Sequence, residues 1–243
     1  MGRVEELLSS LSRYAHLLGF PVNVEWVRLV EELQERIIED VRGEAREYVS
    51  LKDFTAALSS RGYLAKAIEE VSKALAEDVD DPDVALRAAL TGDLEVKGAK
   101  IALIVLQAIA RAYAEEALKR GVTIETSALC PLCGALSETM IKEEGRYTMV
   151  CHFCSYKWVV SEGKPICPYC GNQDELSIAV ISDKQMRVAL MKCWKCDSTW
   201  RAIMDETIRT PLILKPLIAM AAEKFKPALE EIERLVKTEE ENP

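Results

Sequence analysis

The sequence predicts an α+β protein in which an N-terminal helical bundle precedes two tandem short-stranded units and a C-terminal helix. Three observations support this fold class. Apolar residues recur at helical spacing up to about residue 125, all eight cysteines fall between residues 130 and 196, and helical spacing returns after residue 205. We therefore expect four segments: a helical domain (1–125), two cysteine-bearing units (126–163 and 164–205) and a C-terminal helical segment (206–243).

Apolar stripes predict six helices before residue 125, at 4–18, 26–41, one that begins at Ser50, 64–75, 83–90 and 99–120. Asn23 is placed to cap the second of them. Ser50 with Asp53 resembles the capping box that begins the third. The last helix is the most apolar, so we expect it at the centre of the bundle.

Between residues 126 and 205 the apolar pattern changes, and six short strands are expected at 137–142, 146–151, 157–160, 176–182, 186–192 and 200–204. Each half of this region therefore contains a hairpin and a third strand. In the C-terminal segment, Thr210-Pro211 predicts a helix start with proline at its first position. Pro216 and Pro227 predict that this helix kinks or restarts.

The eight cysteines form four Cys-x-x-Cys knuckles, and none is left over. In a chain with no secretory signal, clustered cysteines indicate metal binding before disulfides. A tetrahedral metal takes four thiolates and one knuckle supplies two, which predicts two metal sites. The candidate ligands are Cys130, Cys133, Cys151, Cys154, Cys167, Cys170, Cys193 and Cys196.

An internal repeat predicts which knuckles share a metal. Cys130-Pro-Leu-Cys-Gly134 matches Cys167-Pro-Tyr-Cys-Gly171, and in each half a second knuckle is followed by a tryptophan, Trp158 or Trp200. We therefore expect the first two knuckles to form one site and the last two the other. The glycine after each first knuckle permits a positive φ, which turns backbone N–H groups toward the sulfurs. Ser155 and Asp197 replace that glycine in the second knuckles, which follow the pattern less closely.

The kind of metal stays open between zinc and iron, because a tetrahedron of four thiolates suits both. The first knuckles resemble those of rubredoxin, which favours iron, and the second resemble zinc ribbons. Four thiolates also fill the coordination sphere, so we expect two structural or redox-active metal ions rather than a catalytic one. The sequence has no Gly-rich phosphate loop, Gly-x-Ser-x-Gly or His-Glu-x-x-His motif, and we expect no enzyme activity.

Charge argues against nucleic acid as a partner. The net charge is −9, and residues 126–205 carry nine basic and nine acidic side chains before any metal is bound. We expect the aromatic residues of this region to fill its small core rather than to stack on bases. The longest mostly apolar stretch, 101–110, is too short to span a bilayer, and the N-terminus lacks a signal pattern. These features predict a cytoplasmic protein with no membrane association.

Two segments, Cys130 to Trp158 and Cys167 to Cys196, resemble the formate dehydrogenase accessory proteins of the FdhE family, over about 70 residues. The shared order is a helical part, Cys-Pro-x-Cys-Gly, a hairpin, Cys-x-x-Cys-x-x-x-Trp, a second double-knuckle unit and a C-terminal helix. The resemblance implies two rubredoxin-like metal sites with the eight cysteines as ligands. It also implies a cytoplasmic, non-enzymatic protein that binds the catalytic subunit of formate dehydrogenase during maturation. The family's Asp-Asp-Leu stretch after the last knuckle is absent here, which leaves the client enzyme open.

The sequence therefore predicts a metal-binding accessory protein that binds the catalytic subunit of a formate dehydrogenase-type molybdenum or tungsten enzyme during its assembly. Two alternatives remain. A nucleic-acid-binding zinc-ribbon protein would need a basic face, and an iron–thiolate electron carrier would need a metal that changes its redox state. The oligomeric state is left open.

Overall fold

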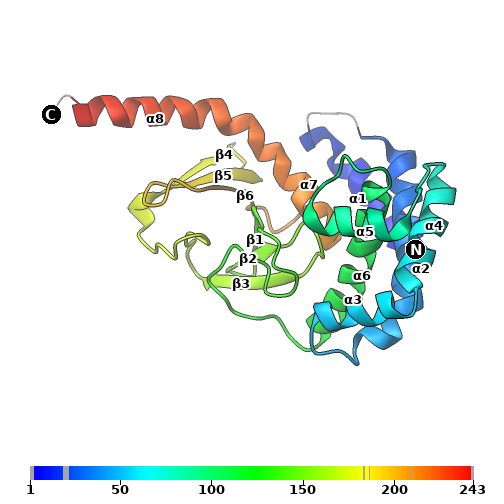
Figure 1. Ribbon diagram of the computed structural model, residues 1–243. Helices are drawn as coiled ribbons and strands as arrows, with labels where there is room; N and C mark the ends of the chain where they lie inside the picture. Colours follow the sequence, from blue (N-terminus) through cyan, green and yellow to red (C-terminus); the bar gives the residue numbers. More distant parts are fainter. Residues whose placement is uncertain (1–2, 19–21, 183, 186, 209, 242–243) are drawn as a thin grey trace. The chain divides into compact units, whose positions relative to one another are not determined.

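The computed structural model describes residues 3–18, 22–182, 184–185, 187–208 and 210–241 (Figure 1). It separates into two compact units: the helical unit, Asn23–Gly121, and the ribbon unit, which combines Met1–Val22 with Val122–Pro243. The first helix is thus grouped with the strands, whereas the sequence places it in a helical domain of residues 1–125. The finer division into four segments stays a prediction.

The helical unit contains five helices: α2 (Val24–Ala45), α3 (Leu51–Ser60), α4 (Tyr63–Leu75), α5 (Pro82–Thr91) and α6 (Ala99–Lys119). Both expected caps are present. Asn23 Oδ1 accepts a hydrogen bond from the backbone N–H of Trp26 at 3.0 Å, and Ser50 Oγ accepts one from Asp53 at 3.1 Å. The most apolar helix, α6, packs against each of the other four, which confirms it as the centre of this bundle.

A buried ion cluster lies inside the helical unit on α6. The Arg111 side chain is 2% exposed, and its guanidinium contacts both carboxylate oxygens of Glu31 on α2, at 3.1 and 3.3 Å. Gln34 accepts a further hydrogen bond from Arg111 and donates one to the Ile104 carbonyl at 3.0 Å. These contacts join α2 to α6 through charged groups that the surrounding apolar core shields from water.

The ribbon unit is built on one six-stranded sheet in the order β3-β2-β1-β6-β5-β4. Its strands are β1 (Thr139–Glu143), β2 (Arg146–Val150), β3 (Lys157–Glu162), β4 (Ile178–Ser182), β5 (Val188–Cys193) and β6 (Thr199–Ile203), as the sequence predicts to within a few residues. Pairing is antiparallel within each half of the repeat. The halves join through a parallel pair, β1 with β6, in which Met140 lies opposite Ala202.

The described part of the ribbon unit contains three α-helices: α1 (Arg3–Leu18), α7 (Lys215–Ala219) and α8 (Lys226–Glu241). The expected start at Thr210-Pro211 is wrong, because a 3₁₀ turn, Leu212–Leu214, precedes α7. Pro216 and Pro227 each occupy the second position of a new helix, α7 or α8, so the predicted restarts are confirmed. Prolines are tolerated there because the N–H groups of a first turn have no partner within the helix.

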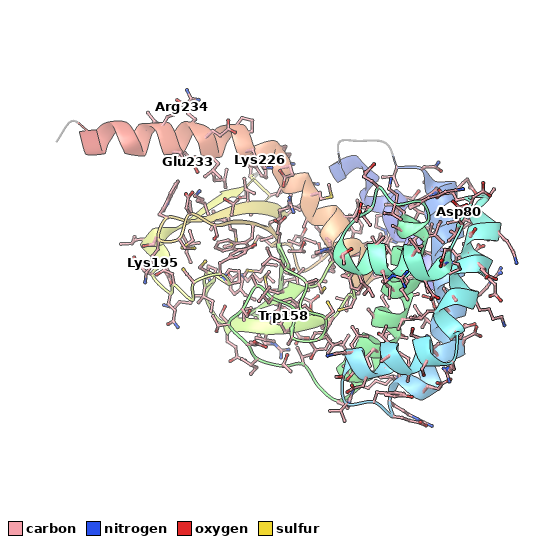
Figure 2. All side chains as sticks on the ribbon, in the orientation of Figure 1. Asp80, Trp158, Lys195, Lys226, Glu233 and Arg234 are labelled. Carbon is pink, nitrogen blue, oxygen red and sulfur yellow. The ribbon has the colours of Figure 1, made fainter. Side chains whose placement is uncertain are left out.

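The ribbon core is aromatic, as expected. Trp158 and Trp200, the equivalent tryptophans of the two halves, are 0% and 1% exposed, and Tyr156 is also buried. The Trp158 indole N–H donates to the Ser127 carbonyl at 2.9 Å. Figure 2 shows Trp158 among the strands of the first half. These rings pack in the interior beside buried aliphatic side chains of the strands, such as Ile141, Leu190 and Ile203.

Candidate metal centres

Each Cys-x-x-Cys knuckle folds as the same tight turn. In all four, the N–H of the first cysteine donates at 2.9 Å to the carbonyl five residues later, in Ala135, Tyr156, Asn172 and Ser198. Gly134 and Gly171 have the positive φ expected of them, 73° and 70°. Ser155 and Asp197 also have positive φ, 59° and 63°, so the second knuckles follow the pattern more closely than their sequences indicate.

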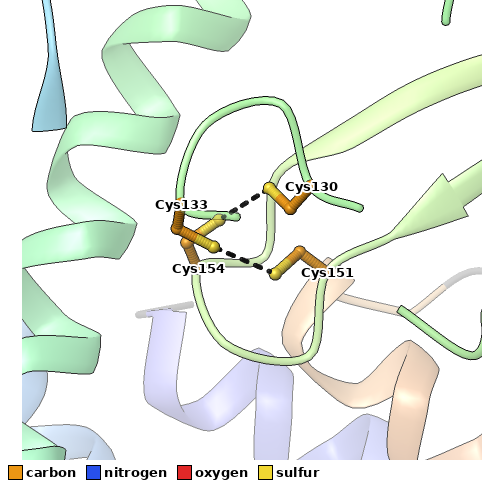
Figure 3. A group of neighbouring side chains, drawn as sticks. All are labelled: Cys130, Cys133, Cys151 and Cys154. Atoms are coloured by element: carbon orange, nitrogen blue, oxygen red, sulfur yellow. Dashed lines mark hydrogen bonds between the residues drawn. The ribbon is translucent and has the colours of Figure 1, made fainter. Parts of the chain in front are cut away.

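The first cluster brings together the cysteines of the first two knuckles. The Cys130 and Cys154 sulfurs are 3.6 Å apart, and those of Cys133 and Cys151 are 3.5 Å apart. Figure 3 shows the four sulfurs pointing inward from two facing loops. All four lie within 4.8 Å of one another, which makes the group able to hold a metal ion.

The second cluster repeats this arrangement with the last two knuckles. The Cys167 and Cys196 sulfurs are 3.5 Å apart, and those of Cys170 and Cys193 are 3.9 Å apart. No cysteine crosses between the halves to join the other group. The grouping is therefore the one that the internal repeat predicts, 1 with 2 and 3 with 4.

The sulfur spacing fits a tetrahedral metal ion. Metal–sulfur bonds of about 2.3 Å at tetrahedral angles place sulfurs about 3.8 Å apart, close to the observed 3.5–3.9 Å. All eight cysteines are free, whereas a disulfide would require sulfurs about 2.05 Å apart. Both clusters could therefore hold a divalent metal, and geometry of this kind accommodates zinc and iron alike.

Neighbouring N–H groups point at the sulfurs in both clusters. The backbone N–H of Phe153 contacts Cys151 Sγ at 3.4 Å, and the Asn172 side-chain amide contacts Cys193 Sγ at 3.8 Å. Such donors stabilise thiolates and orient them toward a metal. Sequence reasoning overlooked Asn172, although its place directly after the Gly171 turn was an available signal.

Close sulfurs also perturb one another's protonation. The pKa of Cys154 is raised, mainly by contact with the Cys130 sulfur. The pKa of Cys130 is lowered, mainly by contact with the Cys133 sulfur. At Cys196, desolvation raises the pKa, but hydrogen bonds with Ser198, whose hydroxyl lies 3.3 Å from the sulfur, and with the Cys170 and Cys167 sulfurs together outweigh it, and the pKa falls to about 6. Thiolates are the form that binds metal, and a metal ion beside a cysteine lowers its pKa.

The two clusters differ in exposure. Cys130, Cys151 and Cys154 are buried in the first, whereas Cys170 of the second is exposed. Beside the second cluster, Lys192 is 6% exposed and reaches Asp197 at 2.5 Å and Glu233 of α8 at 3.1 Å. Lys192 therefore connects the last knuckle to α8 through these two ion pairs. The Cys170 side chain of the same cluster is exposed to solvent.

The fold and the clusters define a class: an α+β protein with a helical part and a duplicated ribbon of two four-cysteine sites on one mixed sheet. The fold is similar to the crystal structure of the FdhE protein from Pseudomonas aeruginosa, with a TM-score of 0.56 and 16% sequence identity, over 95% of this chain and 92% of that one. The resemblance predicted from the knuckles is thus confirmed at the level of the fold. The sequence matches no protein-family model and no curated protein. Among the described residues, no helix is long and apolar enough to cross a membrane.

Proposed function

We propose that this chain is a metal-binding accessory protein that binds the catalytic subunit of a formate dehydrogenase-type molybdenum or tungsten enzyme during assembly in the cytoplasm. The observation that carries the proposal is the fold shared with an FdhE protein along 95% of the chain, combined with two four-cysteine clusters. The eight cysteines act as the ligands of two zinc or iron ions. The metals hold the knuckles in place, and the protein surface binds the client.

Structural metal sites suit a partner-binding role better than a catalytic one. Four thiolates leave no open coordination position for a substrate. With the eight thiolates bound to two divalent ions, the sites carry a formal charge of −2 each, which disfavours binding to phosphates. The client then binds to the protein surface and not to a metal, and the chain itself does not turn over formate.

Affinity purification from the native organism tests the client. The tagged, metal-loaded chain should recover an immature molybdenum or tungsten enzyme, and the Cys151→Ser chain should not, because its ribbon loses a ligand. Lys195→Gln is the matched control: Lys195 is exposed within the last knuckle and ligates nothing, and this variant should keep its metal (Figure 2).

Salt dependence distinguishes this proposal from nucleic-acid binding. A protein that contacts six or more phosphates loses roughly a thousandfold or more in affinity between low and moderate salt, whereas an apolar interface changes little. Salt-sensitive binding to duplex or single strands, with no molybdenum or tungsten enzyme recovered, would contradict the proposal.

We expect a chelator to remove the second metal first, because Cys170 is exposed and the first cluster is mostly buried. Release to a coloured chelator should occur in two phases of equal amplitude. Cys170→Ser should abolish the fast phase, and Cys133→Ser, the equivalent change in the first half, should abolish the slow one. Release in one phase, or loss of the slow phase in Cys170→Ser, would show that exposure does not control exchange.

The exposure of Cys170 favours one second candidate, an iron–thiolate electron carrier, since electron transfer needs a metal close to solvent. A visible spectrum with metal analysis separates the two. Iron that bleaches reversibly on reduction supports the carrier, and colourless zinc in both sites supports the accessory protein.

A further inference from the structure

A cleft of about 800 Å³ lies within the ribbon unit, and no cysteine is among the described residues that line it. Its floor is a row of side chains across four strands: Ile203, Ile141, Thr148 and Val159. Sheet pairing places these residues directly opposite one another, Ile203 with Ile141, Ile141 with Thr148, and Thr148 with Val159. Paired residues share one face of a sheet, so the floor is continuous and mainly apolar. Its volume is typical of a small-molecule site.

Lys215 stands in the wall of this cleft at the start of α7 and is 5% exposed. Its Nζ donates to the Ile208 carbonyl at 2.7 Å, and the nearest carboxylate oxygen, on Glu143, is 3.9 Å away. An ammonium group has three N–H donors, and 3.9 Å exceeds hydrogen-bond length. Within the described part of the chain, two donors of a buried cation therefore have no acceptor, an arrangement that is costly without a ligand.

The inner end of the cleft is positively charged. Glu143 also pairs with Lys157 at 3.0 Å, so two ammonium groups share one carboxylate and leave one net positive charge. Burial lowers the pKa of Lys215, and the Glu143 carboxylate opposes that shift. One negative charge would complete the balance of this group.

The remaining charged side chains of the lining carry one excess negative charge: Glu6, Glu144 and Glu206 against Lys142 and Arg146. Arg146 is already paired with Glu144 at 2.8 Å. A single negative charge on a ligand would neutralise the net positive charge at Lys157, Lys215 and Glu143, whereas a second would have no positive charge to balance it and would face the net negative rim. The cleft therefore combines an apolar floor, one positive end and an acidic rim.

We propose that this cleft binds a small amphipathic monocarboxylate. Its apolar body lies on the floor formed by Ile141, Val159 and Ile203, and its carboxylate lies between Lys157 and Lys215. The same chemistry is offered by a free acid and by the C-terminal carboxylate of an apolar peptide. The inference does not depend on the client enzyme, because it rests only on side chains of the ribbon unit.

Calorimetric titration of the full, metal-loaded chain with octanoate, 1-octanol and octyl phosphate tests the charge requirement. Octanoate should bind in a 1:1 ratio, tighter than octyl phosphate and at least about tenfold tighter than octanol, the effect of one charge-assisted hydrogen bond. Absence of octanoate binding, equal affinity for octanol, or tighter binding of octyl phosphate would overturn the proposal.

The lysines are tested by Lys215→Met and Lys157→Met, each of which should weaken octanoate binding about tenfold. Lys100→Met is the matched control, because Lys100 is exposed in the helical unit and does not line the cleft. Unchanged affinity in both cleft variants would overturn the proposal. If Lys215→Met loses its metal or its helical signal, that variant is misfolded, and the octanoate affinity of Lys157→Met alone tests the proposal.

Two sources of carboxylate are then separated with N-acetyl-leucyl-leucine and its C-terminal amide. Displacement of octanoate by the acid and not by the amide supports a peptide C-terminus as the ligand. Displacement by neither supports a free acid. Displacement by both equally would overturn the requirement for a carboxylate.

Discussion

Removing metal from both clusters should unfold the ribbon unit and leave the helical unit folded. Each structural metal of this kind contributes about 10–16 kcal/mol to folding, as much as a whole domain's typical net stability. The helical unit has no cysteine and has its own buried core around α6. The metal-free chain should therefore retain the helical signal of α2–α6 only.

Tryptophan fluorescence and circular dichroism report on the two units separately. Trp158, Trp194 and Trp200 lie in the ribbon unit, and Trp26 lies in the helical unit. A chelator should therefore shift most of the fluorescence to longer wavelength while much of the far-ultraviolet helical signal persists, and added zinc should reverse the shift. Complete loss of helix with the metal would show that the two units fold as one.

Variants at one knuckle give the matched comparison. Cys154→Ser removes a ligand and should reproduce the effect of the chelator on the first half. Ser155→Gly changes the next residue, whose φ is 59°. Glycine adopts a positive φ more easily than serine, so metal content should be kept and stability kept or slightly raised. Equal loss of metal in both variants would show that the turn, and not the sulfur, is the critical element.

Arg111→Met should destabilise the helical unit by about 3–5 kcal/mol, the usual cost of leaving a buried charge without its partner. Glu31 is only 7% exposed, so its carboxylate would have little access to water once the guanidinium is gone. Gln34 would also lose its hydrogen bond to Arg111. Urea unfolding followed by the helical signal measures the change.

A second substitution separates charge from packing. Arg111→Met combined with Glu31→Leu removes both charges of the closer pair and should recover part of the lost stability, because an apolar pair of similar volume often replaces a buried ion pair without cost. Glu35, which also contacts Arg111 at 3.5 Å, keeps its carboxylate in this variant. Arg61→Met is the surface control: the Arg61–Glu44 pair is partly exposed and should contribute no more than about 1 kcal/mol. Similar losses in Arg61→Met and Arg111→Met would contradict the role assigned to burial.

Much of this fold follows from local sequence. The caps at Asn23 and Ser50 act within three residues of the chain, and the repeat of knuckle, hairpin and knuckle determines which cysteines meet. Such features depend on neighbours in the chain or on an internal duplication, and both are visible in the sequence.

The features that were not predicted depend on residues far apart in the chain. In the sequence, Arg111 is the charged residue that ends an apolar run. In the structure it is buried, because it pairs with Glu31, which lies 80 positions away. The parallel pairing of β1 with β6 joins Met140 to Ala202, and no local pattern specifies which strands of two similar hairpins will meet. The cleft at Lys215 arises for the same reason, since its floor exists only after the sheet has assembled.

Joining the halves through β1 and β6 also affects self-association. Two separate three-stranded sheets would present four open edges, and the continuous sheet presents two, at β3 and β4. The outer side of β3 is occupied, because Val159 exchanges backbone hydrogen bonds with Thr123 and Glu125. Among the described residues β4 has no further strand beside it, and Val180 on it is 41% exposed. In a concentrated solution, β4 is therefore the strand along which copies of this chain would begin to aggregate.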